Sequence, residues 1–217
     1  MQITVFGASG GVGSRVVAEA LSRGHRVRAV SRDASRLSDL PAGVDVRSGD
    51  VSDPDQVARL SADSDVVISA TRPEPGREHE LPEVAAALVE GLSRNGTRLL
   101  VVGGAASLTV PGTGKTLGEQ PDFPAELLPI AEGCNRQLAV FRTAAVQSDG
   151  GPVDWAYLSP AALLEPGTRT GAYRLGTDHL ITDDEGNSAI SMEDLAVVLL
   201  DEAETPEHHR TRFTAGY

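Results

Sequence analysis

Apolar and polar residues recur along the chain with two periods, which predict strands and helices in turn. Short apolar runs predict buried strands, and apolar residues three or four positions apart predict helices between them. Buried strands are expected over 3–6, 26–30, 44–47, 66–70, 98–102 and 153–158. Helices are expected from position 12 to a stop at Gly24, from 52–55 onward, and over about 80–94, 130–147 and 192–203.

The order of these elements predicts the fold class. Strands that alternate with helices at this density predict an α/β fold, a doubly wound parallel sheet with right-handed crossovers. The apolar run at 66–70 favours a central strand, and Ser191 with Asp194 predicts a capping box at the start of the last helix. No repeat or linker interrupts the sequence, so we expect residues 1–217 to form one domain with a small C-terminal substrate-side region. The glycine-rich segment 103–123 is expected to be a loop over a ligand site.

Three glycines separate the first strand from the first helix, in the segment GASGGVG at 7–13. A strand, a glycine turn and a helix in this order predict dinucleotide binding by a Rossmann fold. Gly7 permits the tight turn, Gly10 lets the backbone approach a pyrophosphate, and Gly13 allows close packing of helix on strand. The helix N-terminus then offers free N–H groups to the phosphates. The residues expected to bind cofactor here are Gly7, Ser9, Gly10, Gly11, Val12 and Gly13.

The second strand is followed by Ser31, Arg32 and Asp33. NAD-specific sites usually place a carboxylate at this position to bind the ribose 2′-hydroxyl. A serine and an arginine come first here, and a guanidinium can pair with a 2′-phosphate, so NADP(H) is favoured over NAD(H). The alternative is that Arg32 is a solvated loop residue and that Asp33 caps the short helix after it.

Three further strand ends are expected to contact the cofactor. After the third strand, the Asp50 carboxylate can accept from an adenine amine and the Val51 N–H can donate to a ring nitrogen. A helix-capping turn before Pro54 is the alternative role for Asp50. At the ends of the fourth and fifth strands, small residues allow a cofactor to lie against the backbone. The residues expected at these two ends are Ala70, Thr71, Arg72, Gly103 and Gly104.

Composition and charge exclude several classes of partner. The 217 residues carry a formal net charge of -12, whereas nucleic-acid binding requires a basic surface. No apolar run reaches transmembrane length, and the first strand begins at the second residue, so neither a membrane span nor a signal peptide is expected. Cys134 is the sole cysteine, which favours a cytoplasmic location. No metal site is expected, and His208 and His209 are predicted to be solvated in a polar tail.

Two motifs that the sequence resembles in part are rejected. Gly114-Lys115-Thr116 resembles the end of a P-loop, but Thr109 stands where that motif requires glycine. The tyrosine–lysine pair of standard short-chain dehydrogenases is absent. Lys115 is the only lysine, and no tyrosine stands four residues before it. Reducing a carbonyl needs a positioned proton donor, and no tyrosine acid is expected.

The sequence resembles the atypical short-chain dehydrogenase/reductase superfamily, in the group of NADH-flavin reductases, and is more distantly similar to biliverdin reductase B and to NmrA-like proteins. The resemblance spans essentially the whole chain. The matching segments are VFGASGGVG at 5–13, SRD at 31–33, GDV at 49–51, VVGGAASL at 101–108, PDFP at 121–124, SPA at 159–161 and GNSAISMEDLA at 186–196.

This resemblance implies an NAD(P)H-dependent oxidoreductase that delivers hydride to a flavin or quinone-like small molecule, without a Tyr–Lys pair. It implies that Ser107 lies near the nicotinamide and the acceptor, as a catalytic candidate, and that Ser159, Pro160 and Ala161 hold the carboxamide end of the cofactor. One alternative is a non-catalytic NADP-binding sensor of the NmrA type. Another is a sugar-nucleotide epimerase or dehydratase, which the missing Tyr–Lys pair disfavours. The oligomeric state is not predicted.

Overall fold

The computed structural model describes residues 1–38, 40–147 and 153–217. An eight-stranded sheet forms its centre, in the order β3-β2-β1-β4-β5-β6-β10-β8. The strands of this sheet are β1 (Gln2–Phe6), β2 (Arg26–Ser31), β3 (Asp45–Ser48), β4 (Val66–Ser69), β5 (Arg98–Val102), β6 (Trp155–Ser159), β8 (Arg174–Gly176) and β10 (Thr211–Gly216). Two further short strands, β7 (Leu163–Glu165) and β9 (Ala189–Ser191), pair with each other in parallel.

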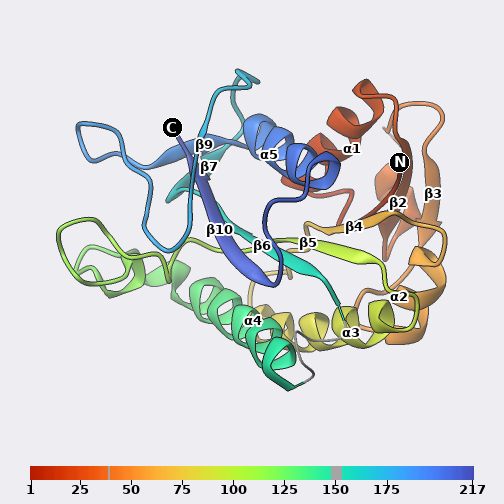
Figure 1. The fold of residues 1–217 in the computed structure, drawn as a ribbon, viewed down its shortest axis with the longest axis horizontal. Helices are drawn as coiled ribbons and strands as arrows, with labels where there is room; N and C mark the ends of the chain where they lie inside the picture. Colours follow the sequence, from red (N-terminus) through yellow and green to blue (C-terminus); the bar gives the residue numbers. More distant parts are fainter. Residues whose placement is uncertain (39, 148–152) are drawn as a thin grey trace.

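Helices cover both faces of the sheet (Figure 1). On one face α1 (Gly11–Ser22) packs beside α5 (Met192–Glu204). On the other face α3 (Leu81–Ser93) packs between α2 (Pro54–Ser61) and α4 (Leu128–Gln147). Each layer buries its own apolar cluster against the sheet. The structure is therefore the expected α/β Rossmann-like fold in one domain.

The sheet is parallel from β3 to β10, and β8 pairs antiparallel with β10 at its edge. The chain passes from β1 to β2 on one side and from β3 to β4 on the other side of β1, so the strand order reverses between β1 and β4. The predicted strands and helices are all present, with ends shifted by up to two residues. The expected central position of β4 is confirmed.

The starts of α2 and α5 show how local sequence sets the helix ends. Asp53 caps α2 by accepting from the N–H groups of Asp55 and Gln56, and Pro54 occupies the first turn. At α5, Ser191 Oγ accepts from the N–H of Asp194 at 2.9 Å. The predicted capping box is half wrong, because the Asp194 carboxylate binds Thr170 and Gly171 instead. The N–H of Ser191 donates to the hydroxyl of Tyr217.

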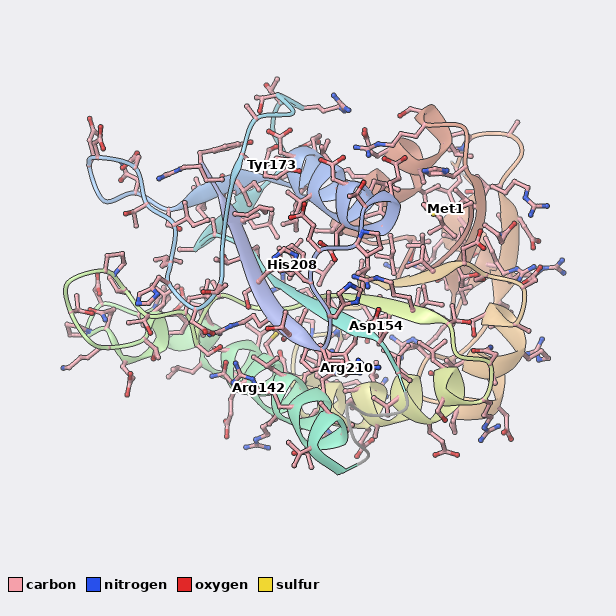
Figure 2. All side chains as sticks on the ribbon, viewed as in Figure 1. Met1, Arg142, Asp154, Tyr173, His208 and Arg210 are labelled. Carbon is pink, nitrogen blue, oxygen red and sulfur yellow. The ribbon has the colours of Figure 1, made fainter. Side chains whose placement is uncertain are left out.

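The C-terminal segment is part of the sheet, whereas the sequence predicted a polar tail there. Phe213 and Ala215 enter the core, and β10 lies between β6 and β8. His208 is half-buried, because its ring stacks on Phe213 at 4.2 Å between centroids and its Nδ1 lies 2.7 Å from Glu202 Oε2. The prediction of a solvated His208 is therefore wrong. Figure 2 shows His208 beside β10, and Asp154 just before β6.

Candidate functional site

The turn from β1 into α1 permits no side chain at two of its glycines. Gly7 has φ +78, and a Cβ there would lie 2.5 Å from the carbonyl oxygen of Ala70. A Cβ at Gly13 would overlap the carbonyl oxygen of Gly7. The roles predicted for these two glycines, a tight turn and close packing, are those the structure gives them. The turn also contacts the end of β4, at the point where the strand order reverses.

The N-terminus of α1 has no side-chain cap and no acidic residue in its first turn. The first N–H groups of a helix lack partners within the helix, so this end can receive an anion. Gly11 is exposed, and a Cβ there would lie 3.0 Å from the Met192 sulfur of α5. In α2 and α5, by contrast, Asp53 and Ser191 occupy the corresponding position. The N-terminus of α1, where phosphate binding is expected, is thus accessible, and the first turn of this helix has no carboxylate.

The end of β2 lies beside this turn. Ser31 Oγ is 3.4 Å from Ser9 Oγ, which joins two residues that were predicted separately. Arg32 is exposed, and its guanidinium makes no hydrogen bond or ion pair with the described part of the chain. Asp33 caps the short helix 34–37, accepting from the hydroxyl and the N–H of Ser35. These bonds hold the pKa of the Asp33 carboxyl below its usual value.

Asp50 and Thr71, at the ends of β3 and β4, make hydrogen bonds to residues two positions away. Asp50 Oδ1 accepts from both the hydroxyl and the N–H of Ser52, so Asp50 stabilises a turn and Asp53 is the helix cap. Val51 packs partly buried against the apolar cluster on the α2 side. After β4, Thr71 Oγ1 lies 3.2 Å from Ser69 Oγ, and Arg72 is exposed. Direct contacts of Asp50 or Val51 with an adenine stay predictions.

The two glycines after β5 are required by the protein's own side chains. A Cβ at Gly103 would overlap the ring of Tyr157, and a Cβ at Gly104 would lie 2.9 Å from the Cβ of Cys134. The Tyr157 hydroxyl lies 3.0 Å from the Cys134 carbonyl oxygen and 3.2 Å from Gln137 Oε1. Burial raises the pKa of Tyr157 well above its ordinary value. Burial also raises the pKa of the Cys134 thiol, to about 11.

Ser107 contacts a buried arginine that the sequence analysis missed. Arg212 Nη1 donates to Ser107 Oγ at 2.9 Å and to the Ser107 carbonyl oxygen at 3.2 Å. Its Nε and Nη2 donate to Asp178 Oδ1, and this pair lowers the pKa of the Asp178 carboxyl. The signal was present in the sequence: Arg212, Thr214 and Gly216 alternate with Phe213 and Ala215, the period of a strand.

The end of β6 and the two residues after it are buried, and one hydroxyl there has no hydrogen-bond partner among the described residues. Ser159 is 0% exposed, and its hydroxyl has no partner among residues 1–38, 40–147 and 153–217. The hydroxyl of Thr214, which pairs with Ser159 across β6 and β10, is in the same situation. Buried hydroxyls without partners are uncommon. The bond expected from Ser159 to the carboxamide of a cofactor stays a prediction. Pro160 and Ala161 are also buried.

The other titratable groups do not form a metal site, and two tyrosines are occupied elsewhere. The described residues contain no group of three or more His, Cys, Asp or Glu side chains placed to hold a metal ion. Tyr173 bonds to Asp201, and the Tyr217 hydroxyl lies 2.7 Å from Asp194 Oδ2. Over the described part of the chain, none of the helices has the length and apolar character needed to cross a membrane.

Comparison with known proteins agrees with this geometry. A model of the NAD(P)H-binding family matches residues 7–206. The uncharacterised protein YwnB of Bacillus subtilis is 40% identical over 221 residues, which cover 99% of this chain and 97% of YwnB.

Two solved structures superpose over the whole chain. A proposed epimerase from Bacteroides thetaiotaomicron has a TM-score of 0.88 at 39% identity and covers 100% of this chain and 96% of its own. SP1627 of Streptococcus pneumoniae, a proposed NADH-flavin reductase, has a TM-score of 0.87 at 30% identity. The match covers 100% of this chain and 99% of SP1627. The chain therefore belongs to the NAD(P)H-binding family, among the proteins similar to atypical short-chain dehydrogenases/reductases.

Proposed function

We propose that the chain is an NADPH-dependent oxidoreductase that transfers hydride to a flavin or a quinone-like acceptor. The observation that carries this proposal is the state of Tyr157. It is the tyrosine nearest to the glycines after β5, yet it is 1% exposed and its hydroxyl is bonded to Cys134 and Gln137. Its raised pKa makes it a poor proton donor. The reaction must then suit an acceptor that does not need a proton from tyrosine.

The residues that would hold the cofactor lie along one edge of the sheet. The uncapped N-terminus of α1 would bind the pyrophosphate. The Arg32 guanidinium, which has no partner in the described part of the chain, would pair with the 2′-phosphate. The unsatisfied hydroxyl of Ser159 would bond the carboxamide. Ser107 would lie near the acceptor. When bound, the reduced cofactor supplies the hydride, and the chain's own residues bind and orient the two reactants.

A conjugated acceptor balances the reaction without an acidic side chain. The acceptor gains two electrons and one proton with the hydride, and its charge is spread over the ring system. A second proton comes from water, which reaches the half-exposed Ser107. Reduced flavins and hydroquinones take up this proton from solvent, whereas the alkoxide formed from a simple ketone requires a donor in place.

The test is oxidation of NADPH by the purified chain, followed at the nicotinamide absorbance, with FMN, riboflavin, a quinone and a simple ketone as acceptors. We expect turnover with the conjugated acceptors and none with the ketone. NADPH should bind more tightly than NADH. Tight cofactor binding without turnover across the panel would contradict the proposal.

The same assay separates two other functions. A non-catalytic sensor should bind without turnover and should distinguish oxidised from reduced cofactor. The Bacteroides relative is named as a proposed epimerase, and epimerisation would consume no net NADPH. Epimerases of this superfamily rely on a tyrosine–lysine pair. Here Tyr157 is buried and the only lysine, Lys115, is exposed on a loop.

We also infer that the protein works in the cytoplasm. Its sole cysteine, Cys134, is a free thiol, so the fold needs no oxidising compartment. Fractionation of the native host with an antibody to the chain tests this, and recovery in an extracellular fraction would contradict it.

A further inference from the structure

We infer that Arg212 is a positioning residue that turns Ser107 into a hydrogen-bond donor aimed at the acceptor; this inference rests on the proposed function. Arg212 lies on β10, level with Tyr157 on β6. Its side chain is 5% exposed, whereas Ser107 is half-exposed on the loop after β5. The two residues are separated by 105 positions. Their contact therefore joins the loop over the site to the buried face of the sheet.

The guanidinium is held in one orientation. Nε and Nη2 both donate to Asp178 Oδ1. Asp178 lies in the segment between β8 and β10. This segment is itself joined to the loop over the site, because Thr109 N–H donates to the Asp178 carbonyl oxygen at 2.9 Å. With two nitrogens committed to Asp178, Nη1 is the nitrogen directed at Ser107. A rigid planar fork loses little freedom on making this third bond.

The chemistry of the two groups fixes the direction of the bond. A guanidinium carries N–H donors and no acceptor, whereas a serine hydroxyl has one donor and two lone pairs. Ser107 Oγ must therefore accept from Arg212. Its own proton has no acceptor among the residues that the structure describes, so it stays available for a ligand. Without Arg212 the hydroxyl could rotate and accept from the ligand as easily as donate to it.

The neighbourhood of this pair also suits a polar ligand. Side chains two positions apart on a strand share a face, so Thr214 follows Arg212 on β10 as Ser159 follows Tyr157 on β6. Both hydroxyls, Ser159 Oγ and Thr214 Oγ1, are buried without a partner among the described residues. The pair Arg212–Ser107 thus lies next to unsatisfied polar groups. The positive charge of Arg212 further favours an acceptor oxygen or nitrogen that gains negative charge as hydride arrives.

A double-mutant cycle tests this inference. We expect Ser107→Ala to lower kcat for flavin reduction about 100-fold and Arg212→Lys about tenfold, with KM for NADPH changed by less than about twofold. In the S107A background, R212K should change kcat no further, because both act through one hydroxyl. Asp178→Asn should act in the same direction as R212K and should also lose its effect in S107A. Effects of R212K that multiply with those of S107A would overturn the inference.

Arg142 is the matched control. It lies on α4 (Figure 2), and its Nη2 is 3.8 Å from the same Asp178 oxygen. Among the described residues no contact joins it to Ser107. Arg142→Gln should therefore leave kcat unchanged, and thermal unfolding of every variant shows whether folding is intact. A loss of kcat in R142Q equal to that in R212K would mean that only the charge matters, which overturns a positioning role.

A binding measurement keeps the inference apart from the proposed function. FMN is added to the chain loaded with NADP⁺, and quenching of flavin fluorescence gives its Kd. If the wild-type chain binds FMN but does not reduce it, the proposed function fails, and the same non-additive pattern in Kd still supports the role of Arg212. If S107A and R212K weaken binding independently, the role of Arg212 fails while the proposed function stands. If the wild-type chain neither binds nor reduces FMN, both the proposed function and the role of Arg212 fail.

Discussion

Tyr157 on β6 occupies the space that a side chain at Gly103, just after the neighbouring strand β5, would need. The tyrosine ring is buried and packs against Phe141 at 6.2 Å between centroids, so it has no room to move away. We expect Gly103→Ala to lower the free energy of unfolding by about 2–3 kcal/mol, the cost of overpacking a close-packed core. Urea unfolding measures this. In a Tyr157→Leu background the same change should cost less, and equal costs in both backgrounds would contradict the clash.

Arg32 should set the preference for NADPH. Its guanidinium has no partner in the described chain, so its removal should cost little stability. We expect Arg32→Ala to raise the Kd for NADPH about 10- to 100-fold, the loss of one charge-assisted contact, and to leave the Kd for NADH nearly unchanged. Arg47→Ala is the matched control, because Arg47 is also exposed but pairs with Asp45. Equal weakening of both cofactors by R32A would show that Arg32 does not contact the 2′-phosphate.

The main strands and helices could be predicted because their patterns are local. The turn at Gly7–Gly13 contains its own strand, glycines and helix, and Asp53 with Pro54 signals a helix start within two residues. β10 has a local alternation of strand period, but that pattern does not show where the strand lies in the sheet. Its strand forms by pairing Thr214 with Ser159 and with Gly176, which lie 55 and 38 positions away. The contact between Arg212 and Ser107 depends on that long-range pairing, so the sequence predicted Ser107 without its partner.

Glu19 should make stability depend on pH in acid. Hydrogen bonds from Arg169 and, to a lesser extent, Arg23 together lower its pKa to about 2, against the opposing effect of burial. Because the folded pKa lies below the unfolded value of 4.5, the stabilisation is complete above pH 4.5 and is lost as the pH falls towards 2. The shift corresponds to up to about 3 kcal/mol. Urea unfolding at pH 7, 4 and 3 should show this loss in the wild type.

Glu19→Gln should be less stable at pH 7 and should lose less on acidification. Glu132→Gln is the control, because Glu132 is 64% exposed and its pair with Arg136 is a surface contact. Its acid dependence should match that of the wild type. An E19Q variant that loses as much stability as the wild type between pH 4.5 and 3 would show that other carboxylates carry the effect.

The Cys134 thiol should be nearly inert in the folded protein. Burial raises its pKa to about 11, so its thiolate fraction at pH 8 is about 100-fold below that of an ordinary cysteine. The reaction with a disulfide reagent such as Ellman's should be slower by at least this factor and should become fast in urea. Rapid labelling of the native chain at pH 8 would mean that the thiol is exposed and ionised. Cofactor binding should slow the labelling further, since Cys134 packs against Gly104.

Ser159 provides the sharpest separation of binding from folding. Its buried hydroxyl has no partner in the described chain, and a buried unsatisfied polar group is costly. Ser159→Ala should therefore leave the free energy of unfolding of the cofactor-free chain unchanged or raise it by about 1 kcal/mol. The same variant should weaken cofactor binding about tenfold, the loss of one hydrogen bond to the carboxamide.

Ser61→Ala is the control and should do the reverse. The buried hydroxyl of Ser61, at the end of α2, donates to the Val57 carbonyl oxygen at 2.6 Å. This variant should lower stability by about 1 kcal/mol and leave cofactor affinity unchanged. Calorimetric titration with NADP⁺ and urea unfolding measure both quantities on each variant. If S159A leaves the cofactor affinity unchanged, the Ser159 hydroxyl does not bond the cofactor, because the loss of such a hydrogen bond must lower the affinity.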